Sequence, residues 1–144
     1  MSRRLLLLAA AAISIAIVAA SPAAASQPSQ TAWAVQANKV CLVWLAKAKK
    51  AFGSPVTAAQ LYTFALKAKA LETQELGVLE QIPGRTSTGT AALTSLKVDI
   101  AEVGSAITAW KHGNAAKFVT ILKRYINDER PKSAFALAGA NQCG

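Results

Sequence analysis

The 144-residue chain is poor in the side chains that build most metal and catalytic centres. Its single histidine, His112, argues against a His-based zinc centre, a paired haem clamp and a serine triad. No Glu-x-x-His pair occurs, so the ligand set of a di-iron helical bundle is missing. The sequence therefore predicts a protein without catalytic residues, metal or cofactor.

Signals for β-structure are missing as well. No stretch alternates polar and apolar residues between hairpin turns, so we expect no sheet. The segment Gly84–Thr90 has the glycine spacing of a phosphate-binding loop, but it lacks the lysine and no strand precedes it, so we interpret it as a connector.

His112 falls in the last turn of a predicted helix. An imidazole suits the helix dipole there, which favours a structural role over that of a single axial haem ligand.

The first 25 residues have the features of an export signal. Arg3 and Arg4 precede an apolar run, Leu5–Ala20, that is too short to span a bilayer comfortably. Ala23–Ala25 place small residues where a signal peptidase cuts, whereas an uncleaved membrane anchor is the alternative. We expect a signal peptide over residues 1–25 and a mature protein that is secreted, periplasmic or on the exterior of the cell envelope.

The mature chain has the size of one domain. We expect a flexible leader over residues 26–30 and a helical domain over 31–144. Two of the 16 Lys and Arg residues lie in the signal peptide, which leaves 14 against 7 acidic residues, a formal charge of +7. Cys41 and Cys143 are the only cysteines, and oxidising surroundings favour a bridge between them.

Apolar residues recur at three- and four-residue steps, which predicts amphipathic helices. The first, over about 31–52, turns inward a face made of Trp33, Ala37, Val40, Cys41, Trp44, Ala48 and Phe52. The second begins at Thr57, which can form a capping box with Gln60, and it stops at Pro83. The third follows a polar loop, 85–90, and carries the clearest stripe, namely Leu93, Leu96, Ile100, Val103, Ile107 and Trp110.

Asn114 offers an N-cap for a fourth helix, whose inward side is predicted to be Phe118, Val119, Leu122, Tyr125 and Ile126. Pro131 closes this helix, and Ser133 can cap a last short turn. The fold predicted is all-α: a four-helix up-down-up-down bundle with a short C-terminal helical turn and one disulfide, Cys41 to Cys143.

Glu72 and Glu75 are out of place, because both fall within the apolar arc of the second helix. Carboxylates that face a bundle core are typical of a metal site. The other interpretation is that Gly77 loosens the helix and lets both carboxylates reach solvent or lysines such as Lys69. We favour the second interpretation.

The charge excess predicts attraction to polyanions. The basic surface expected on the outer faces of the helices includes Lys39, Lys47, Lys50, Lys117, Lys123 and Arg124. Outside the cytoplasm, an anionic envelope polymer, a lipid surface or a protein partner is favoured over nucleic acid.

Short motifs resemble a group of small exported helical proteins of actinobacteria that have no assigned function. They are Asn38-Lys39-Val40-Cys41, Leu79 with Ile82-Pro83, and Ala136 to Gly139 followed by Cys143. The resemblance implies the bundle and the Cys41–Cys143 bridge, and it carries over no catalytic residue.

Three functions follow from these features. The first is an exported, non-enzymatic binding module with a basic surface. The second is a carrier for a small apolar ligand between the helices, which the three tryptophans suggest. The third is a metal-dependent enzyme that uses Glu72 and Glu75.

Overall fold

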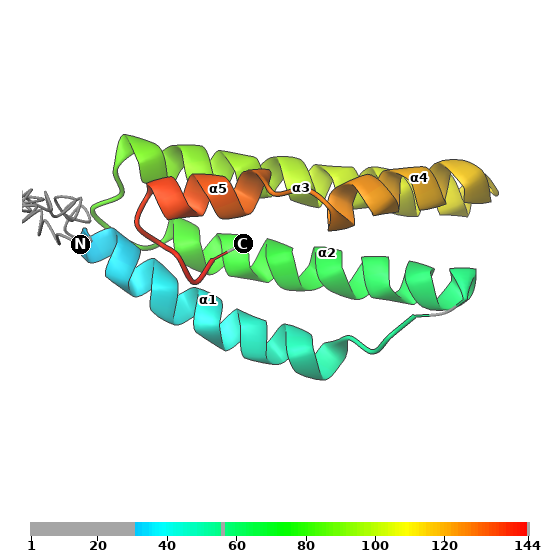
Figure 1. Ribbon diagram of the computed structural model, residues 1–144, viewed down its shortest axis with the longest axis horizontal. Helices are drawn as coiled ribbons and strands as arrows, with labels where there is room; N and C mark the ends of the chain where they lie inside the picture. Colours follow the sequence, from blue (N-terminus) through cyan, green and yellow to red (C-terminus); the bar gives the residue numbers. More distant parts are fainter. Residues whose placement is uncertain (1–30, 56, 144) are drawn as a thin grey trace, which may run out of the picture.

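The computed structural model describes residues 31–55 and 57–143, and this part of the chain is helical without strands. The helices are α1 (Ala32–Ala51), α2 (Ala58–Glu80), α3 (Ser87–Lys111), α4 (Ala115–Ile126) and α5 (Arg130–Leu137) (Figure 1). The predicted signal peptide, the leader and Val56 lie outside the described residues. Within the described ranges, no helix has both the length and the apolarity that a bilayer span needs.

α3 is the central helix of the fold. It contacts α2 on one side, and α4 and α5 follow one another along its other side, as Figure 1 shows. α1 packs against α2. The predicted short C-terminal turn is therefore a helix, α5, which covers the length of α3 that the 12-residue α4 leaves open.

Four of the helices begin with an N-cap residue whose polar side chain accepts a hydrogen bond from the first turn. The capping box predicted at Thr57 is confirmed, since its hydroxyl accepts from the Gln60 N–H at 3.2 Å and the Gln60 side chain accepts from the Thr57 N–H at 3.0 Å. Asn114 caps α4 as predicted, through the Lys117 N–H. Thr31 caps α1 in the same way.

The prediction of a loop over residues 85–90 was wrong beyond Thr86. This residue caps α3 by accepting the Gly89 N–H at 3.1 Å, so the helix already begins at Ser87. Gly89 has a packing role instead of a phosphate-binding one, because a Cβ there would lie 3.1 Å from the Trp33 ring. The glycine lets α3 approach the start of α1.

The predictions for the end of the fourth helix also need correction. Pro131 does not close α4; it lies in the first turn of α5, where proline is tolerated because its missing N–H has no helical partner. Ser133 lies inside α5 and does not cap it. Ile126 is 55% exposed, and Ile121, one turn from Phe118 and Tyr125, takes its place in the core.

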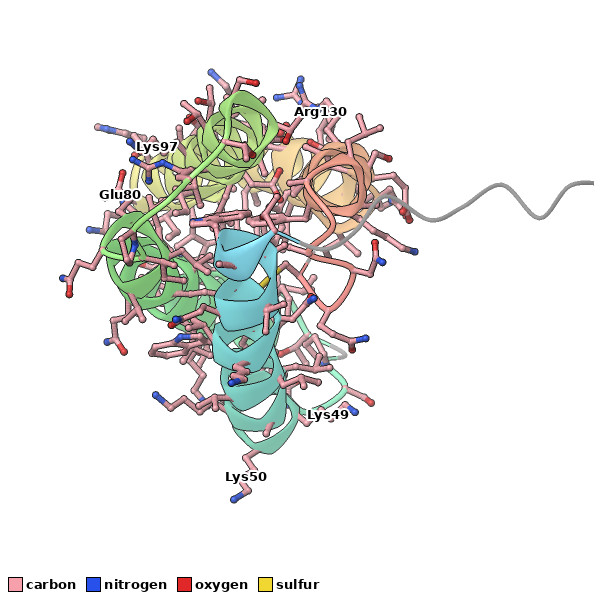
Figure 2. The ribbon with its side chains drawn as sticks, turned by 90° about the vertical axis from the view of Figure 1, so that its left-hand side faces the viewer. Lys49, Lys50, Glu80, Lys97 and Arg130 are labelled. Carbon is pink, nitrogen blue, oxygen red and sulfur yellow. A yellow bond between two sulfur atoms is a disulfide. The ribbon has the colours of Figure 1, made fainter. Side chains whose placement is uncertain are left out.

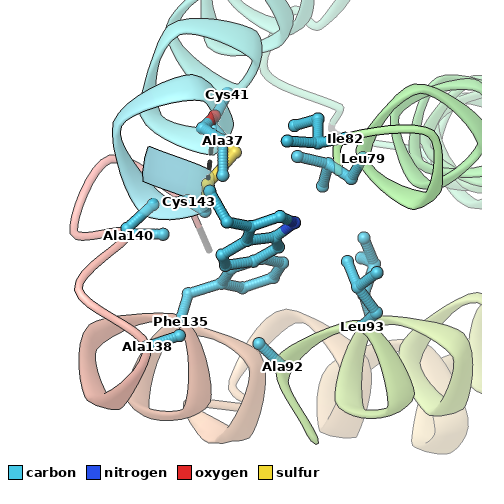
Figure 3. Close-up of a cluster of buried hydrophobic side chains, with 13 residues drawn as sticks. Ala37, Cys41, Leu79, Ile82, Ala92, Leu93, Phe135, Ala138, Ala140 and Cys143 are labelled. Carbon is cyan, nitrogen blue, oxygen red and sulfur yellow. Dashed lines mark hydrogen bonds between the residues drawn. A yellow bond between two sulfur atoms is a disulfide. The ribbon is translucent and has the colours of Figure 1, made fainter. Parts of the chain in front are cut away.

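The core consists of two clusters. The first contains the fully buried Trp33. Figure 3 shows other members of this cluster, Leu79, Leu93 and Phe135, around the disulfide. In the second, Phe118 packs with Val103, Leu122 and others, and the ring of Trp110 stacks on Tyr62 with centroids 5.4 Å apart.

Cys41 and Cys143 form the predicted disulfide, which joins α1 to the C-terminal tail (Figure 3). The Asn38 side chain reinforces this junction. It accepts the Gln142 N–H at 2.8 Å and donates to the Gly139 carbonyl at 3.3 Å. Residues that are 101 to 104 positions apart in the sequence are thus fixed side by side.

Candidate functional site

A cleft of about 250 Å³ lies beside the second half of α1. The buried residues of α1 all lie between Trp33 and Trp44, and none beyond Trp44 is buried, because the helix draws away from α2 toward its C-terminus (Figure 1). Trp44 and Phe52 line one side of the cleft, and Glu72, Glu75 and Asp99 line another. We call this space the acidic cleft.

Five of the seven acidic residues gather at or next to the acidic cleft, in a chain whose net charge is +9. We call them the carboxylate cluster: Glu72, Glu75, Asp99, Glu102 and Asp128. The other two, Glu80 and Glu129, pair on the surface with Lys97 and Lys132. Most of the acidic side chains are therefore gathered in one place.

Asp99 is the central member of the carboxylate cluster. It is 8% exposed, and its Oδ1 has no hydrogen-bond partner. One oxygen each of Asp99, Glu102 and Asp128 lie within 4.8 Å of one another. Burial, a hydrogen bond with Asp128 and the charge of Glu72 raise the pKa of Asp99 to about 7.

The favoured expectation was that both Glu72 and Glu75 reach solvent or lysines; the structure has both half-buried, and both line the acidic cleft. Within residues 31–55 and 57–143, no lysine pairs with either carboxylate. Lys69 instead extends over Gly104 of α3. Burial raises the pKa of both glutamates to about 7, and for Glu75 the charge of Glu72 adds to this effect.

Tyr125 of α4 donates a hydrogen bond to Glu72 Oε1. Burial, together with the charge of Glu72, raises the pKa of the tyrosine, which keeps the hydroxyl protonated and able to donate. The second oxygen of Glu72, Oε2, is buried and has no hydrogen-bond partner. Two members of the carboxylate cluster, Asp99 and Glu72, thus each have an unused oxygen.

Two arginines form ion pairs with Glu102 and Asp128 of the carboxylate cluster. Arg124 pairs with Glu102, and Arg130 pairs with Asp128 at 2.5 Å and with Glu102 at 3.5 Å. The hydrogen bond from Arg130 lowers the pKa of Asp128 to about 2. Arg124 was predicted to belong to the free basic surface, but its charge is partly neutralised by Glu102.

The lysines predicted for the basic surface, Lys39, Lys47, Lys50, Lys117 and Lys123, are all exposed. Of the 14 Lys and Arg residues in the described ranges, four form ion pairs, which leaves ten that form none. These ten are Lys39, Lys47, Lys49, Lys50, Lys67, Lys69, Arg85, Lys111, Lys117 and Lys123. Figure 2 shows Lys49 and Lys50 pointing away from the body of the protein at the end of α1, whereas Lys97 lies beside Glu80.

α1 also exposes large apolar side chains next to its lysines. Leu42 and Val43 are half exposed, and Val35 is 40% exposed. The ammonium of Lys47 lies 3.5 Å from the centroid of the Trp44 ring, a cation–π contact.

His112, the candidate for a single haem ligand, is exposed at the C-cap of α3 and does not line the acidic cleft.

Sequence reasoning missed most of the carboxylate cluster and its partners, namely Asp99, Glu102, Asp128, Tyr125 and Arg130. One signal for Asp99 was present. Asp99 belongs to a stripe of inward-facing residues on α3 that are spaced four and three positions apart in turn. The stripe consists of Ala92, Leu96, Asp99, Val103 and Ala106. No comparable pattern marks Asp128, which lies in the connection between α4 and α5.

Chemically, the acidic cleft offers oxygen ligands and negative charge beside two aromatic rings. Such a site suits a hard cation or protons. The cleft wall that carries Glu72, Glu75 and Asp99 does not suit a purely apolar ligand, because bound hydrocarbon would remove water from these carboxyl groups. Comparison of the chain with protein-family models, with curated proteins and with solved structures finds no match.

Proposed function

We propose that the protein is an exported, non-enzymatic binding module that docks on an anionic lipid surface through the outward face of α1. The observation that carries this proposal is the separation of charge. Five of the seven acidic residues are withdrawn into the carboxylate cluster, while ten basic side chains in the described ranges stay exposed without an ion pair. The exterior is therefore more basic than the net charge alone indicates.

The face of α1 that would meet the lipid lies opposite its buried face. At 100° per residue, the buried positions Trp33, Ala37 and Trp44 share one side of the helix. The opposite side carries a mixed set of lysines and apolar residues, namely Val35, Lys39, Leu42, Val43, Ala46, Lys49 and Lys50. None of these seven side chains is buried.

The apolar residues favour a lipid surface over a soluble polyanion. A polyanion would contact the lysines and leave Leu42 and Val43 in water. At a membrane interface, apolar side chains enter the boundary between head groups and acyl chains while lysines contact anionic head groups. One helix face that holds both kinds of side chain suits the second partner.

The proposed location and the proposed topology agree with this function. The signal peptide predicted over residues 1–25 would place the mature chain outside the cytoplasm, where the Cys41–Cys143 disulfide is stable. In the up-down-up-down bundle that we propose, α4 and α5 together form the fourth rod. α1 is then an outer rod, and its outward face is free to meet a surface.

Co-sedimentation with lipid vesicles tests the function. We expect the disulfide-bonded, processed protein to bind vesicles that contain phosphatidylglycerol and not vesicles of phosphatidylcholine alone. Binding should weaken steeply as the salt rises from about 0.01 M to about 0.15 M, which shortens the Debye length from about 30 Å to about 8 Å.

Two outcomes would reject the lipid surface as partner. The first is equal binding to neutral and anionic vesicles. The second is binding to a soluble polyphosphate that leaves Leu42→Gln as tight as the wild type, since the apolar residues would then have no part in recognition.

A further inference from the structure

We propose that the acidic cleft holds a binding site for one calcium ion, with Asp99 as the central ligand and oxygens of Glu102, Asp128 and Glu72 around it. This site is independent of the docking of α1 on lipid. It rests on the carboxylate cluster, on the unused oxygens of Asp99 and Glu72, and on the distances between the oxygens of Asp99, Glu102 and Asp128.

The unused oxygens indicate that the carboxylate cluster lacks a partner. Asp99 is more than nine-tenths buried and lines the cleft, yet its Oδ1 accepts no hydrogen bond. Glu72 Oε2 is also buried and unsatisfied in the same cleft. Buried polar atoms are nearly always paired, and a bound ion is one of the few partners that would satisfy two carboxylate oxygens together.

The site has an excess of negative charge that one divalent cation would largely neutralise. Arg124 and Arg130 offset two of the five carboxylates. Lys132 also lines the acidic cleft, but it is paired with Glu129. Glu72, Glu75 and Asp99 have no cationic partner within the described residues. A divalent ion would balance two of these three charges.

The ligands select the ion by their chemistry and spacing. All are carboxylate oxygens, which hard cations prefer, and the exposed His112 and the bridged cysteines offer nothing to a softer metal. Oxygens on opposite sides of a calcium ion are about 4.8 Å apart, twice a Ca–O distance of about 2.4 Å. The oxygens of Asp99, Glu102 and Asp128 lie within this limit.

The open side of the cleft leaves room for water ligands. Calcium takes six to eight oxygens in flexible geometry, so four carboxylates and a few waters complete its shell. Magnesium demands a near-ideal octahedron at shorter distances, to which ligands on α2, on α3 and in the α4–α5 connection are poorly suited. We therefore assign the site to calcium.

Calorimetric titration of the disulfide-bonded protein with Ca²⁺ tests the site. We expect one ion per chain, with a dissociation constant on the order of 10⁻⁴ to 10⁻³ M, as in extracellular calcium modules. Asp99→Asn should weaken binding at least tenfold and Glu72→Gln should weaken it as well. Glu80→Gln removes an exposed carboxylate of the same helix α2 and should bind as the wild type does.

A second readout separates loss of the site from loss of the fold. Ca²⁺ should raise the Tm of the wild type and of Glu80→Gln, and should leave the Tm of Asp99→Asn unchanged. Asp99→Asn should itself fold, since the neutral amide replaces a carboxyl that burial already disfavours as an anion. The proposal would be overturned if no saturable Ca²⁺ binding occurred up to about 10 mM, which is tenfold above the dissociation constant of the weakest extracellular modules. Equal binding by wild type and Asp99→Asn, or tighter binding of Mg²⁺ than of Ca²⁺, would do the same.

Discussion

The hydroxyl of Tyr125 in α4 donates a hydrogen bond to Glu72 in α2, across 53 positions of sequence. The bond joins two helices whose other core neighbours are mainly apolar. The bond holds one oxygen of Glu72 in place and leaves the other, Oε2, buried without a hydrogen-bond partner.

Tyr125→Phe removes this bond and leaves a buried carboxylate without its donor. We expect a loss of about 1 to 3 kcal/mol in the free energy of unfolding, the cost of an unsatisfied buried acceptor. Urea unfolding near neutral pH measures it. Tyr62→Phe is the matched control, since the ring of Tyr62 stacks on Trp110 and its hydroxyl makes no hydrogen bond within the described residues. Equal losses in both variants would show that the contact with Glu72 contributes nothing.

The raised pKa values make the calcium-free protein sensitive to pH. The pKa of Glu75 is about 7 in the folded protein and near its ordinary value of 4.5 in the unfolded chain. The folded state therefore holds more protons between these values, so stability is greatest at acid pH and falls as the pH rises from about 4.5 to about 7.

Glu75→Gln should flatten this dependence, because the amide does not titrate. In the presence of a chelator, we expect the free energy of unfolding of the wild type to drop by some kcal/mol between about pH 5 and about pH 8, and that of Glu75→Gln to drop less. Denaturant unfolding at the two pH values gives the difference. Parallel profiles for the two proteins would place Glu75 in solvent.

Two glycines in helices should respond to alanine with opposite signs. At Gly89, a Cβ would lie 3.0 Å from Arg85 Cγ and 3.1 Å from the fully buried ring of Trp33, so Gly89→Ala should destabilise by about 1 to 3 kcal/mol. At Gly77, a Cβ meets nothing within 4 Å, so Gly77→Ala should stabilise α2 by about 0.5 to 1 kcal/mol. Thermal unfolding of both variants compares them directly. A stabilised Gly89→Ala would mean that α1 and α3 are farther apart than the structure has them.

The disulfide should contribute mainly through the long loop that it closes. Its cysteines are 102 positions apart, so Cys41→Ala together with Cys143→Ala should cost about 2 to 4 kcal/mol. The wild type in reducing buffer should unfold like the double variant. An unchanged stability of the double variant would show that Asn38 and the apolar contacts of the tail suffice to hold it.

Local signals in the sequence predicted much of the helical fold. The capping box of Thr57 and Gln60 and the cap at Asn114 depend only on residues three positions apart, and the structure contains both. The pairing of Cys41 with Cys143 was predicted because the chain has two cysteines and its sequence predicts export. The start of α3 was missed because its polar first turn, Ser87–Thr90, was taken for a loop, although Thr86 caps it.

The carboxylate cluster could be predicted only in part. Glu72 and Glu75 stood out because they interrupt the apolar side of one helix. Their neighbours come from α3 and from the α4–α5 connection, and which residues meet there depends on the break between α4 and α5 at Asn127 to Glu129. Sequence periodicity gives the face of each helix, but it does not give this register between helices.

The most direct test of the proposed function compares two triple variants with the same loss of charge. In the first, Lys39, Lys49 and Lys50 on the outward face of α1 are changed to glutamine. In the second, Lys111, Lys117 and Lys123 of α3 and α4 are changed in the same way. All six side chains are exposed, and none forms an ion pair within residues 31–55 and 57–143.

The measurement is the affinity of each variant for phosphatidylglycerol-containing vesicles at low salt. At about 1 kcal/mol per lysine near an anionic surface, the α1 variant should bind about a hundredfold more weakly than the wild type. The second variant should lose much less, since its lysines would face away from the lipid. Equal losses in the two variants would contradict docking through α1 and leave only a general attraction of a basic protein to negative charge.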